Sequence, residues 1–385
     1  MVRFNRLVMT VLACAAAVVL PDVAGASDPL CLGSYGSVPA QAAASLRFGI
    51  DPGLAGSAGG VQLPTVPDNP ARDLAAVERL QPNGRVLVVR LNRLFWSDGN
   101  RGIASFKRAT AGYTRAGFDV EIQVRYHPAP SEVANLRAWN GYVRHVVDVL
   151  GANPRVIAMT ITNEVNIAIS PNTSDGYYAR ADDALIEGIE AAHAEAIKDG
   201  YSQLRFGFTY AYRFSPAGDA ALFHYLAVHG GARFRQALGF VGVDAYPGTI
   251  YPPTIKPGQS YGAALAQALG TVRDCYLRLA QIGPSTPIWI TENGVPTGKL
   301  SGAAQAAALT QLVDAAHEYS KTFNVTDYRW FNLRDSTTQP LADATFSSDG
   351  LLRADYSRKP SFGAYRLLIE RFGTMTPKCD KPICG

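Results

Sequence analysis

The stretch 287-PIWITENG-294 joins a short apolar run to a polar end, and the same pattern recurs along the chain. Apolar runs rich in Val, Ile, Phe and Tyr are typical of buried parallel strands. The pattern predicts eight strands, at Leu46–Asp51, Val86–Leu94, Asp119–His127, Arg155–Glu164, Leu204–Tyr212, Phe240–Tyr246, Pro287–Glu292 and Asp327–Leu333. We therefore expect a core of parallel strands whose polar ends meet at one face.

Longer stretches with helical composition alternate with these strands. They predict helices at Ala71–Leu80, Gly102–Gly117, Ser131–Leu150, Arg180–Gly200, Ala217–Leu238, Tyr261–Gln281, Gly302–Thr322 and Ser361–Phe372. Strand and helix in strict alternation imply right-handed crossovers between parallel strands. Eight such units predict an α/β protein with a single (β/α)8 barrel. A doubly wound open sheet is the alternative, but residues 51–56 lack the G-x-G-x-x-G spacing that its first turn favours.

The N-terminal segment has the features of an export signal. Met1–Ala26 begins with two arginines, continues with an apolar run and ends with small residues, which predicts a signal peptide cleaved after Ala26. The apolar run is shorter than the ~20 residues that span a bilayer. Lipidation at Cys14 is an alternative, although the apolar run continues past this cysteine. We expect a secreted or extracytoplasmic protein without stable membrane insertion, in which residues 27–385 form the barrel and two short extensions.

The cysteine content indicates disulfide bonds, and the net charge bears on the kind of partner. Cleavage leaves Cys31, Cys275, Cys379 and Cys384, and four cysteines in an exported protein are typical of two disulfides. A local pair of the last two would leave Cys31 for Cys275, while the other connectivities stay open. The formal net charge of +4 is too mild to indicate a nucleic-acid partner.

Two glutamates stand at strand ends, where the active sites of this fold lie. The fourth predicted strand ends at Glu164, and the seventh ends at Glu292. These strands face each other across the mouth of an eight-stranded barrel. Two carboxyl groups roughly 5–5.5 Å apart can cleave a glycosidic bond with retention, one as proton donor and the other as nucleophile.

Asn163-Glu164 and Thr291-Glu292-Asn293-Gly294 together resemble clan A, a large clan of retaining (β/α)8 glycoside hydrolases. The resemblance implies that Glu164 is the acid/base, that Glu292 is the nucleophile and that Asn163 binds the sugar 2-hydroxyl. It further implies an arginine near the nucleophile (Arg90), a tyrosine beside it (Tyr246) and a tryptophan platform under the sugar ring (Trp330). The implied mechanism needs no metal and no organic cofactor.

Strand periodicity adds two expectations. Strict alternation places Ile288 and Ile290 in the barrel interior and turns Trp289 toward the helices. It also turns Asn163 away from the mouth, so the implied role of this residue requires a bend at the strand end.

Further side chains at strand ends are candidates for sugar contacts. His127 ends the third strand, Trp96 follows the second, and Tyr210 lies near the end of the fifth together with Tyr212. A structural histidine and core aromatic residues are the alternatives for these positions.

The predicted function is a secreted retaining glycosidase, acting as a monomer on a carbohydrate. Poly- and oligosaccharides with β-linkages are the default substrates, and endo and exo action both stay open. A transglycosylase on the same site and an inactive glycan-binding barrel are alternatives. A serine hydrolase is disfavoured because we identify no G-x-S-x-G nucleophile elbow, and a zinc hydrolase because none of the six histidines forms an H-E-x-x-H or similar pair.

Overall fold

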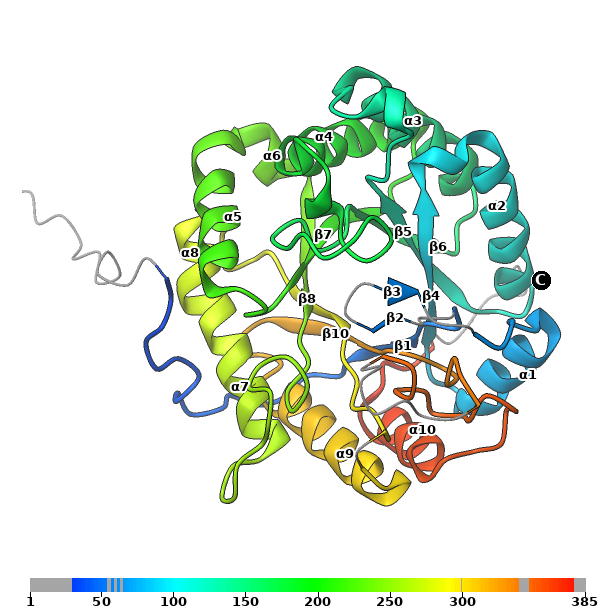
Figure 1. The fold of residues 1–385 in the computed structure, drawn as a ribbon, viewed down its shortest axis with the longest axis vertical. Helices are drawn as coiled ribbons and strands as arrows, with labels where there is room; N and C mark the ends of the chain where they lie inside the picture. Colours follow the sequence, from blue (N-terminus) through cyan, green and yellow to red (C-terminus); the bar gives the residue numbers. More distant parts are fainter. Residues whose placement is uncertain are drawn as a thin grey trace, which may run out of the picture.

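The protein is a closed barrel of eight parallel strands surrounded by helices (Figure 1). The computed structural model describes residues 30–53, 57–58, 61–62, 65–298, 300–338 and 346–376. The barrel strands are β1 (Arg47–Ile50), β4 (Leu87–Phe95), β5 (Asp119–Arg125), β6 (Val156–Ile161), β7 (Arg205–Ala211), β8 (Leu238–Asp244), β9 (Ile288–Glu292) and β10 (Val325–Trp330). Strand β1 pairs with both β4 and β10, which closes the sheet and confirms the predicted (β/α)8 barrel.

The helices follow the predicted order. They are α1 (Pro70–Leu80), α2 (Gly99–Arg115), α3 (Leu136–Gly151), α4 (Ala181–Asp199), α5 (Pro216–His229), α6 (Gly231–Ala237), α7 (Tyr261–Thr271), α8 (Leu277–Leu279), α9 (Gly302–Glu318) and α10 (Pro360–Phe372). The predicted helix Ala217–Leu238 is two helices, because Gly231 adopts a φ of +64° and ends the first. Between α7 and α8 the chain forms a π-helical turn at Val272–Tyr276. The short hairpin of β2 (Ser57–Ala58) and β3 (Val61–Gln62) was not predicted.

The alternation prediction for β9 was wrong. Trp289 faces the barrel interior, where its ring stacks on Phe240 at a centroid distance of 3.7 Å and an interplanar angle of 7°. Ile288 and Ile290 belong instead to the large apolar core that the barrel shares with the helices. The outer face of the strands packs on helices and therefore takes the aliphatic residues, while ring stacking and ion pairs fill the interior.

A chain of ion pairs runs through that interior. Cations and anions alternate in the order Arg47, Asp327, Arg329, Glu121, Arg90 and Glu292. Each step has a nitrogen–oxygen distance between 2.7 and 3.3 Å. Buried charges persist only when they are paired and hydrogen-bonded. The chain therefore fixes the polar interior and ends at Glu292, one of the two predicted catalytic residues.

A disulfide joins Cys31 in the N-terminal segment to Cys275 in the π-helical turn. It confirms one of the two expected pairs. The other pair, Cys379 with Cys384, and the expected signal peptide lie outside the described residues. In the described part of the chain, no helix has the length and apolar character to cross a membrane.

Candidate active site

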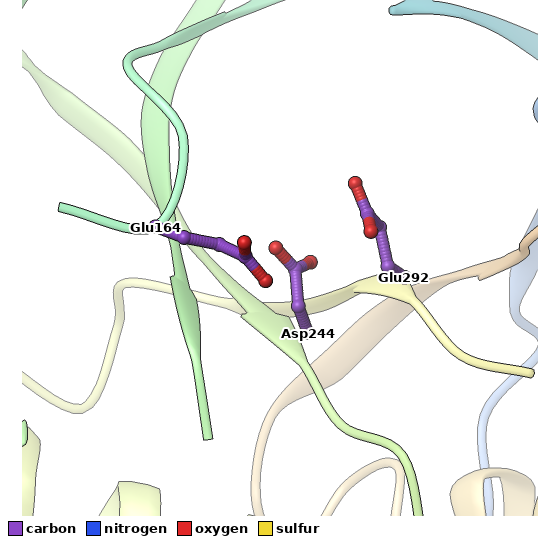
Figure 2. Close-up of side chains that lie close together, drawn as sticks. All are labelled: Glu164, Asp244 and Glu292. Carbon is purple, nitrogen blue, oxygen red and sulfur yellow. The ribbon is translucent and has the colours of Figure 1, made fainter. Parts of the chain in front are cut away.

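Three carboxyl groups meet at the mouth of the barrel (Figure 2). Glu292 is the last residue of β9, Asp244 is the last of β8, and Glu164 follows the end of β6. One oxygen atom of each lies within 4.8 Å of one from each of the others. The two predicted glutamates are therefore brought together, and Asp244 joins them. Its position at a strand end, two residues before Tyr246, is the sequence signal that could have found it.

A bend after β6 presents Asn163 and Glu164 together. Thr162 and Glu164 adopt φ values of 70° and 47°, in the left-handed region that non-glycine residues rarely occupy. The bend that Asn163 requires is thus present. The Asn163 side-chain oxygen accepts hydrogen bonds from Gln123 at 2.6 Å and from Thr209 at 3.0 Å. Its amide nitrogen is thereby turned toward Glu164, 3.4 Å away.

Asp175 holds this bend in place. One carboxylate oxygen accepts hydrogen bonds from the backbone N–H groups of Tyr126 at 2.8 Å and Asn163 at 2.9 Å. The other oxygen accepts from Nε of Arg125 at 2.8 Å. Asp175 is fully buried, so these contacts are shielded from water. Sequence reasoning missed this residue because it lies in the short 3₁₀ helix Asp175–Tyr177, well beyond the end of β6 in the sequence.

Glu292 is held by two hydrogen-bond donors. Nη1 of Arg90 donates to Oε1 at 2.8 Å, and the hydroxyl of Tyr246 donates to Oε2 at 2.9 Å. Arg90 is fully buried, and its guanidinium charge favours the ionised carboxylate. Burial and the nearby charge of Glu292 raise the pKa of Tyr246 well above its usual value. Tyr246 therefore keeps its proton and stays a donor.

Glu164 has the opposite environment. Burial, followed by the negative charge of Glu292, raises the pKa of Glu164 to about 8. Burial and the charges of Glu292 and Glu164 also raise the pKa of Asp244 well above its ordinary value. Burial therefore favours the protonated forms of Glu164 and Asp244, while Arg90 and Tyr246 donate hydrogen bonds to Glu292.

Glu164, Asp244 and Glu292 also lie close enough together to be considered as ligands of a metal ion, and they form the group of this kind among the described residues. Arg90 already neutralises Glu292, and burial favours protons on Glu164 and Asp244. The arrangement therefore fits proton transfer better than cation binding.

Both glutamates open onto one cavity. Its lining comprises Asn92, Arg93, Arg125, Asn163, Glu164, Asn172, Thr173, Tyr246, Glu292, Phe331 and Phe346. A larger cavity of about 470 Å³ lies between α1 and α2 and shares Asn92 with it. We assign the chemistry to the smaller cavity because it contains the paired carboxyl groups.

Five predicted binding residues lie outside this lining: Arg90, which pairs with Glu292 and Glu121, and four aromatic or histidine residues. Trp330 is fully buried, and its indole N–H donates to the backbone oxygen of Asp349 at 2.9 Å. The aromatic residues that line the cavity are Tyr246, Phe331, which directly follows Trp330, and Phe346. The structure therefore does not place Trp330 where it could contact a sugar in this cavity.

The other three are the remaining strand-end aromatic and histidine candidates. Tyr210 is fully buried and packs edge-on against Phe223 at a centroid distance of 5.0 Å. Trp96 lies in the core and stacks on Tyr126 at 5.7 Å. His127 is half-buried and its Nδ1 is 2.8 Å from the hydroxyl of Ser97. Tyr210 and Trp96 are therefore placed as core aromatic residues and His127 as a structural histidine, which were the alternatives for these positions.

Residues 258–262 (GQSYG) do match the G-x-S-x-G pattern of a serine nucleophile. The structure gives Ser260 another role. Its hydroxyl accepts a hydrogen bond from the backbone N–H of Ala263 at 3.0 Å and caps the N-terminus of α7. The serine is a helix cap that no strand directly precedes, so it is not a nucleophile elbow.

Comparison with known proteins gives structural matches. No known family profile and no curated protein sequence matches the chain. A GH5_18 protein from Streptomyces cattleya in complex with GlcNAc has 17% identity and a TM-score of 0.59, over 87% of this chain and 82% of that one. The similarity is one of fold. A GH5_18 variant from Bifidobacterium longum subsp. longum in complex with Manb1-4GlcNAc has 16% identity and a TM-score of 0.58, over 86% and 80% of the two chains. A β-glucosidase from Thermotoga maritima in complex with castanospermine has 14% identity and a TM-score of 0.58, over 88% of this chain and all of the other.

Proposed function

We propose that the protein is a retaining glycoside hydrolase that cleaves O-glycosidic, by default β-linked, bonds. The observation that carries the proposal is the pair of glutamates at the barrel mouth, one held by Arg90 and Tyr246 and the other buried beside it. One carboxyl oxygen of Glu164 lies within 4.8 Å of one of Glu292, which is closer to the short spacing of double displacement than to the wider spacing of inverting enzymes. The fold shared with GH5_18 proteins and a β-glucosidase supports the same reading.

In the first step, Glu292 attacks the anomeric carbon while the glycosidic C–O bond breaks. Glu164 donates its proton to the departing oxygen, which leaves as an alcohol. Arg90 and Tyr246 fix the attacking carboxylate, and Arg90 keeps it ionised before the attack. A glycosyl ester on Glu292 and a carboxylate on Glu164 result.

In the second step, water hydrolyses the glycosyl ester on Glu292. Burial is the main cause of the raised pKa of Glu164, and the repulsion from Glu292 that adds to it is relieved when Glu292 becomes an ester. Glu164 now accepts a proton from water, whose oxygen attacks the anomeric carbon. The sugar leaves with retained configuration, and both glutamates return to their initial states.

The proposal also covers the location of the enzyme, its oligomeric state and its binding residues. Export is supported by the signal pattern of Met1–Ala26 and by the disulfide between Cys31 and Cys275. We propose a monomer acting on a carbohydrate, with Asn163, Arg90 and Tyr246 in the binding site.

The test is a panel of aryl glycosides assayed with wild type, Glu292→Gln and Glu164→Ala. Glu292→Gln should lower kcat/KM by about 10³-fold or more, because the amide cannot act as nucleophile. Glu164→Ala should regain turnover with azide on substrates with good leaving groups, since azide needs no base.

The matched control is Glu318→Gln, which makes the same change at an exposed position on α9. It should retain wild-type rates. Full activity in Glu292→Gln would falsify the assignment.

A further inference from the structure

Asp244 is a buried acid beside the catalytic pair that the two proposed steps do not use. It is the last residue of β8 and is fully buried. Figure 2 shows its carboxyl group between those of Glu164 and Glu292, and one oxygen atom of each residue lies within 4.8 Å of one from each of the others. A third carboxyl group at this distance either carries a proton or disturbs the charge on both glutamates.

The hydrogen bonds of the Asp244 side chain are only half complete. Its Oδ1 accepts a hydrogen bond from the hydroxyl of Thr291 at 2.7 Å. Its Oδ2 is buried and has no hydrogen-bond partner among the described residues. A buried polar atom without a partner costs free energy. A partner that becomes available only during the reaction would remove that cost.

The surroundings of Asp244 favour its neutral form. Burial, followed by the negative charges of Glu292 and Glu164, raises the pKa of Asp244 well above its ordinary value. The charge of Arg90 opposes this effect, but the ion pairs of Arg90 in the described part of the chain, at 2.8 to 3.8 Å, are with other carboxyl groups. Because Oδ1 accepts from Thr291, the proton of the neutral form belongs on Oδ2. That atom is therefore a hydrogen-bond donor.

The acceptor that the reaction creates beside this donor is Glu164. Glu292 already accepts hydrogen bonds from Arg90 and Tyr246, and it loses its charge when the glycosyl ester forms. Glu164 gains a negative charge in the same step, and donors are most effective where charge develops. In the structure Glu164 accepts a long hydrogen bond from Asn163 at 3.4 Å, so its carboxyl group can turn toward a stronger donor once it is charged.

We propose that Asp244 is a positioning residue, whose neutral carboxyl group donates a hydrogen bond from Oδ2 to the carboxylate that Glu164 becomes in the glycosyl-enzyme. The inference rests on the proposed glycosidase function and adds a third residue to it. Asp244 keeps its own proton throughout, so no further covalent bond is made or broken. A carboxylic acid held neutral by its site can act as such a donor. The hydrogen bond stabilises the charged form of Glu164, which favours the first step and lowers the pKa at which Glu164 becomes a base for the second.

The test compares Asp244→Asn with Asp244→Ala on the 4-nitrophenyl and 2,4-dinitrophenyl glycosides of the sugar that wild type cleaves in the aryl glycoside panel. Asp244→Asn has the same shape and a neutral N–H donor, so its kcat/KM should stay within about threefold of wild type. Asp244→Ala removes the donor and should lower kcat/KM for the 4-nitrophenyl glycoside by about 10- to 100-fold, because a hydrogen bond to a charged group is lost. The control Asp148→Ala, at a side chain on α3 that is 58% exposed, should leave both rates unchanged.

The pH dependence separates this role from a structural one. The 2,4-dinitrophenyl leaving group needs little acid assistance, so kcat then reports on the second step, in which Glu164 must be ionised. The acid limb of kcat should move to higher pH by about one to two units in Asp244→Ala and stay unchanged in Asp244→Asn. The other charged groups that act on Glu164 in the free enzyme are the same in both variants: Glu292 of β9, Arg125 of β5, Arg90 of β4 and Asp175 of the 3₁₀ helix.

Wild-type rates in Asp244→Ala, or a loss of rate without a shift of the acid limb, overturn the inference. Asp244→Asn that is as impaired as Asp244→Ala overturns it as well, because the acid itself would then be required. If thermal unfolding shows that Asp244→Ala does not fold, Asp244→Leu, which fills the volume without a donor, should show the same shift. All these outcomes leave the dependence on Glu292 intact, whereas activity that survives Glu292→Gln overturns the proposed function instead.

Discussion

The two glutamates of this site have identical side chains in contrasting environments. Glu292 receives two hydrogen bonds, one of them from a buried cation, and is suited to act as a carboxylate. Glu164 is buried near that carboxylate and is suited to carry the proton. The difference lies in the neighbours, since the chemical group is the same. The proposed roles follow from this contrast.

The raised pKa of Glu164 predicts the alkaline limit of activity. The first step needs the protonated form, so kcat/KM should fall with rising pH through about 8. A pH–rate profile with an aryl glycoside substrate measures the midpoint. The same raised pKa lowers the free energy of unfolding as pH rises from the ordinary pKa of glutamate toward about 8. Unfolding must therefore be measured over the same pH range. A midpoint near pH 5 with the fold intact would contradict the assigned role.

Strand-end reasoning could predict the residues that point straight into the mouth. Glu164 and Glu292 were found this way, because each ends or follows a regular apolar run, whereas Arg90, inside β4, and Tyr246 were proposed from the resemblance to clan A. This reasoning could not identify Asp175, because a residue between two strands reaches the site only after the chain folds back onto the strand ends.

At the scale of elements, the irregular segments position the site. The bulge in β4 turns Arg93 toward the cavity, and the bend after β6 brings Asn163 beside Glu164. The sequence predicts the regular strands well, since their apolar runs have a clear length and composition. It does not predict register shifts, which depend on pairing with the neighbouring strand. The wrong assignment of Trp289 arose in the same way, because either face of a barrel strand can be apolar.

Asp175 offers a test of how one loop supports the site. Asp175→Asn removes the charge that pairs with Arg125, a fully buried contact, and should lower stability by about 3 kcal/mol. It should also lower kcat/KM by about tenfold or more, because the backbone N–H of Asn163 loses a charged acceptor. Thermal unfolding and steady-state kinetics measure the two effects.

Asp148→Asn, at a side chain that is 58% exposed, is the control for the charge change and should be neutral in both assays. If Asp175→Asn behaves like this control, the loop is held by other contacts.

At the scale of the whole molecule, closure and covalent linkage act together. Strand β1 completes the barrel by pairing with β10, its most distant partner in sequence. The disulfide between Cys31 and Cys275 spans 244 residues and encloses most of the barrel. The overall fold was predictable because eight repeats of strand and helix leave few other arrangements. The disulfide pairing was only one of several allowed by the cysteine count.

The disulfide predicts a marked dependence of stability on redox conditions. Replacing Cys31 and Cys275 by serine should lower the free energy of unfolding by about 3–5 kcal/mol, because a long loop is released in the unfolded chain. Denaturant unfolding with and without reductant measures the effect. Reductant should destabilise wild type far more than the double variant, in which any remaining shift reports on Cys379 and Cys384. Equal shifts in both would contradict a stabilising role for the Cys31–Cys275 bond.

The same bond imposes an order of events on biosynthesis. Cys31 is made 244 positions before its partner, so its thiol has to stay reduced until most of the barrel has been synthesised. Its partner lies in the π-helical turn before α8, by which point β1 and β4 to β8 already exist. The bond therefore cannot form until the segments of β1 and β4 to β8 have been synthesised. Premature oxidation with another cysteine would trap the chain before β9 and β10 arrive.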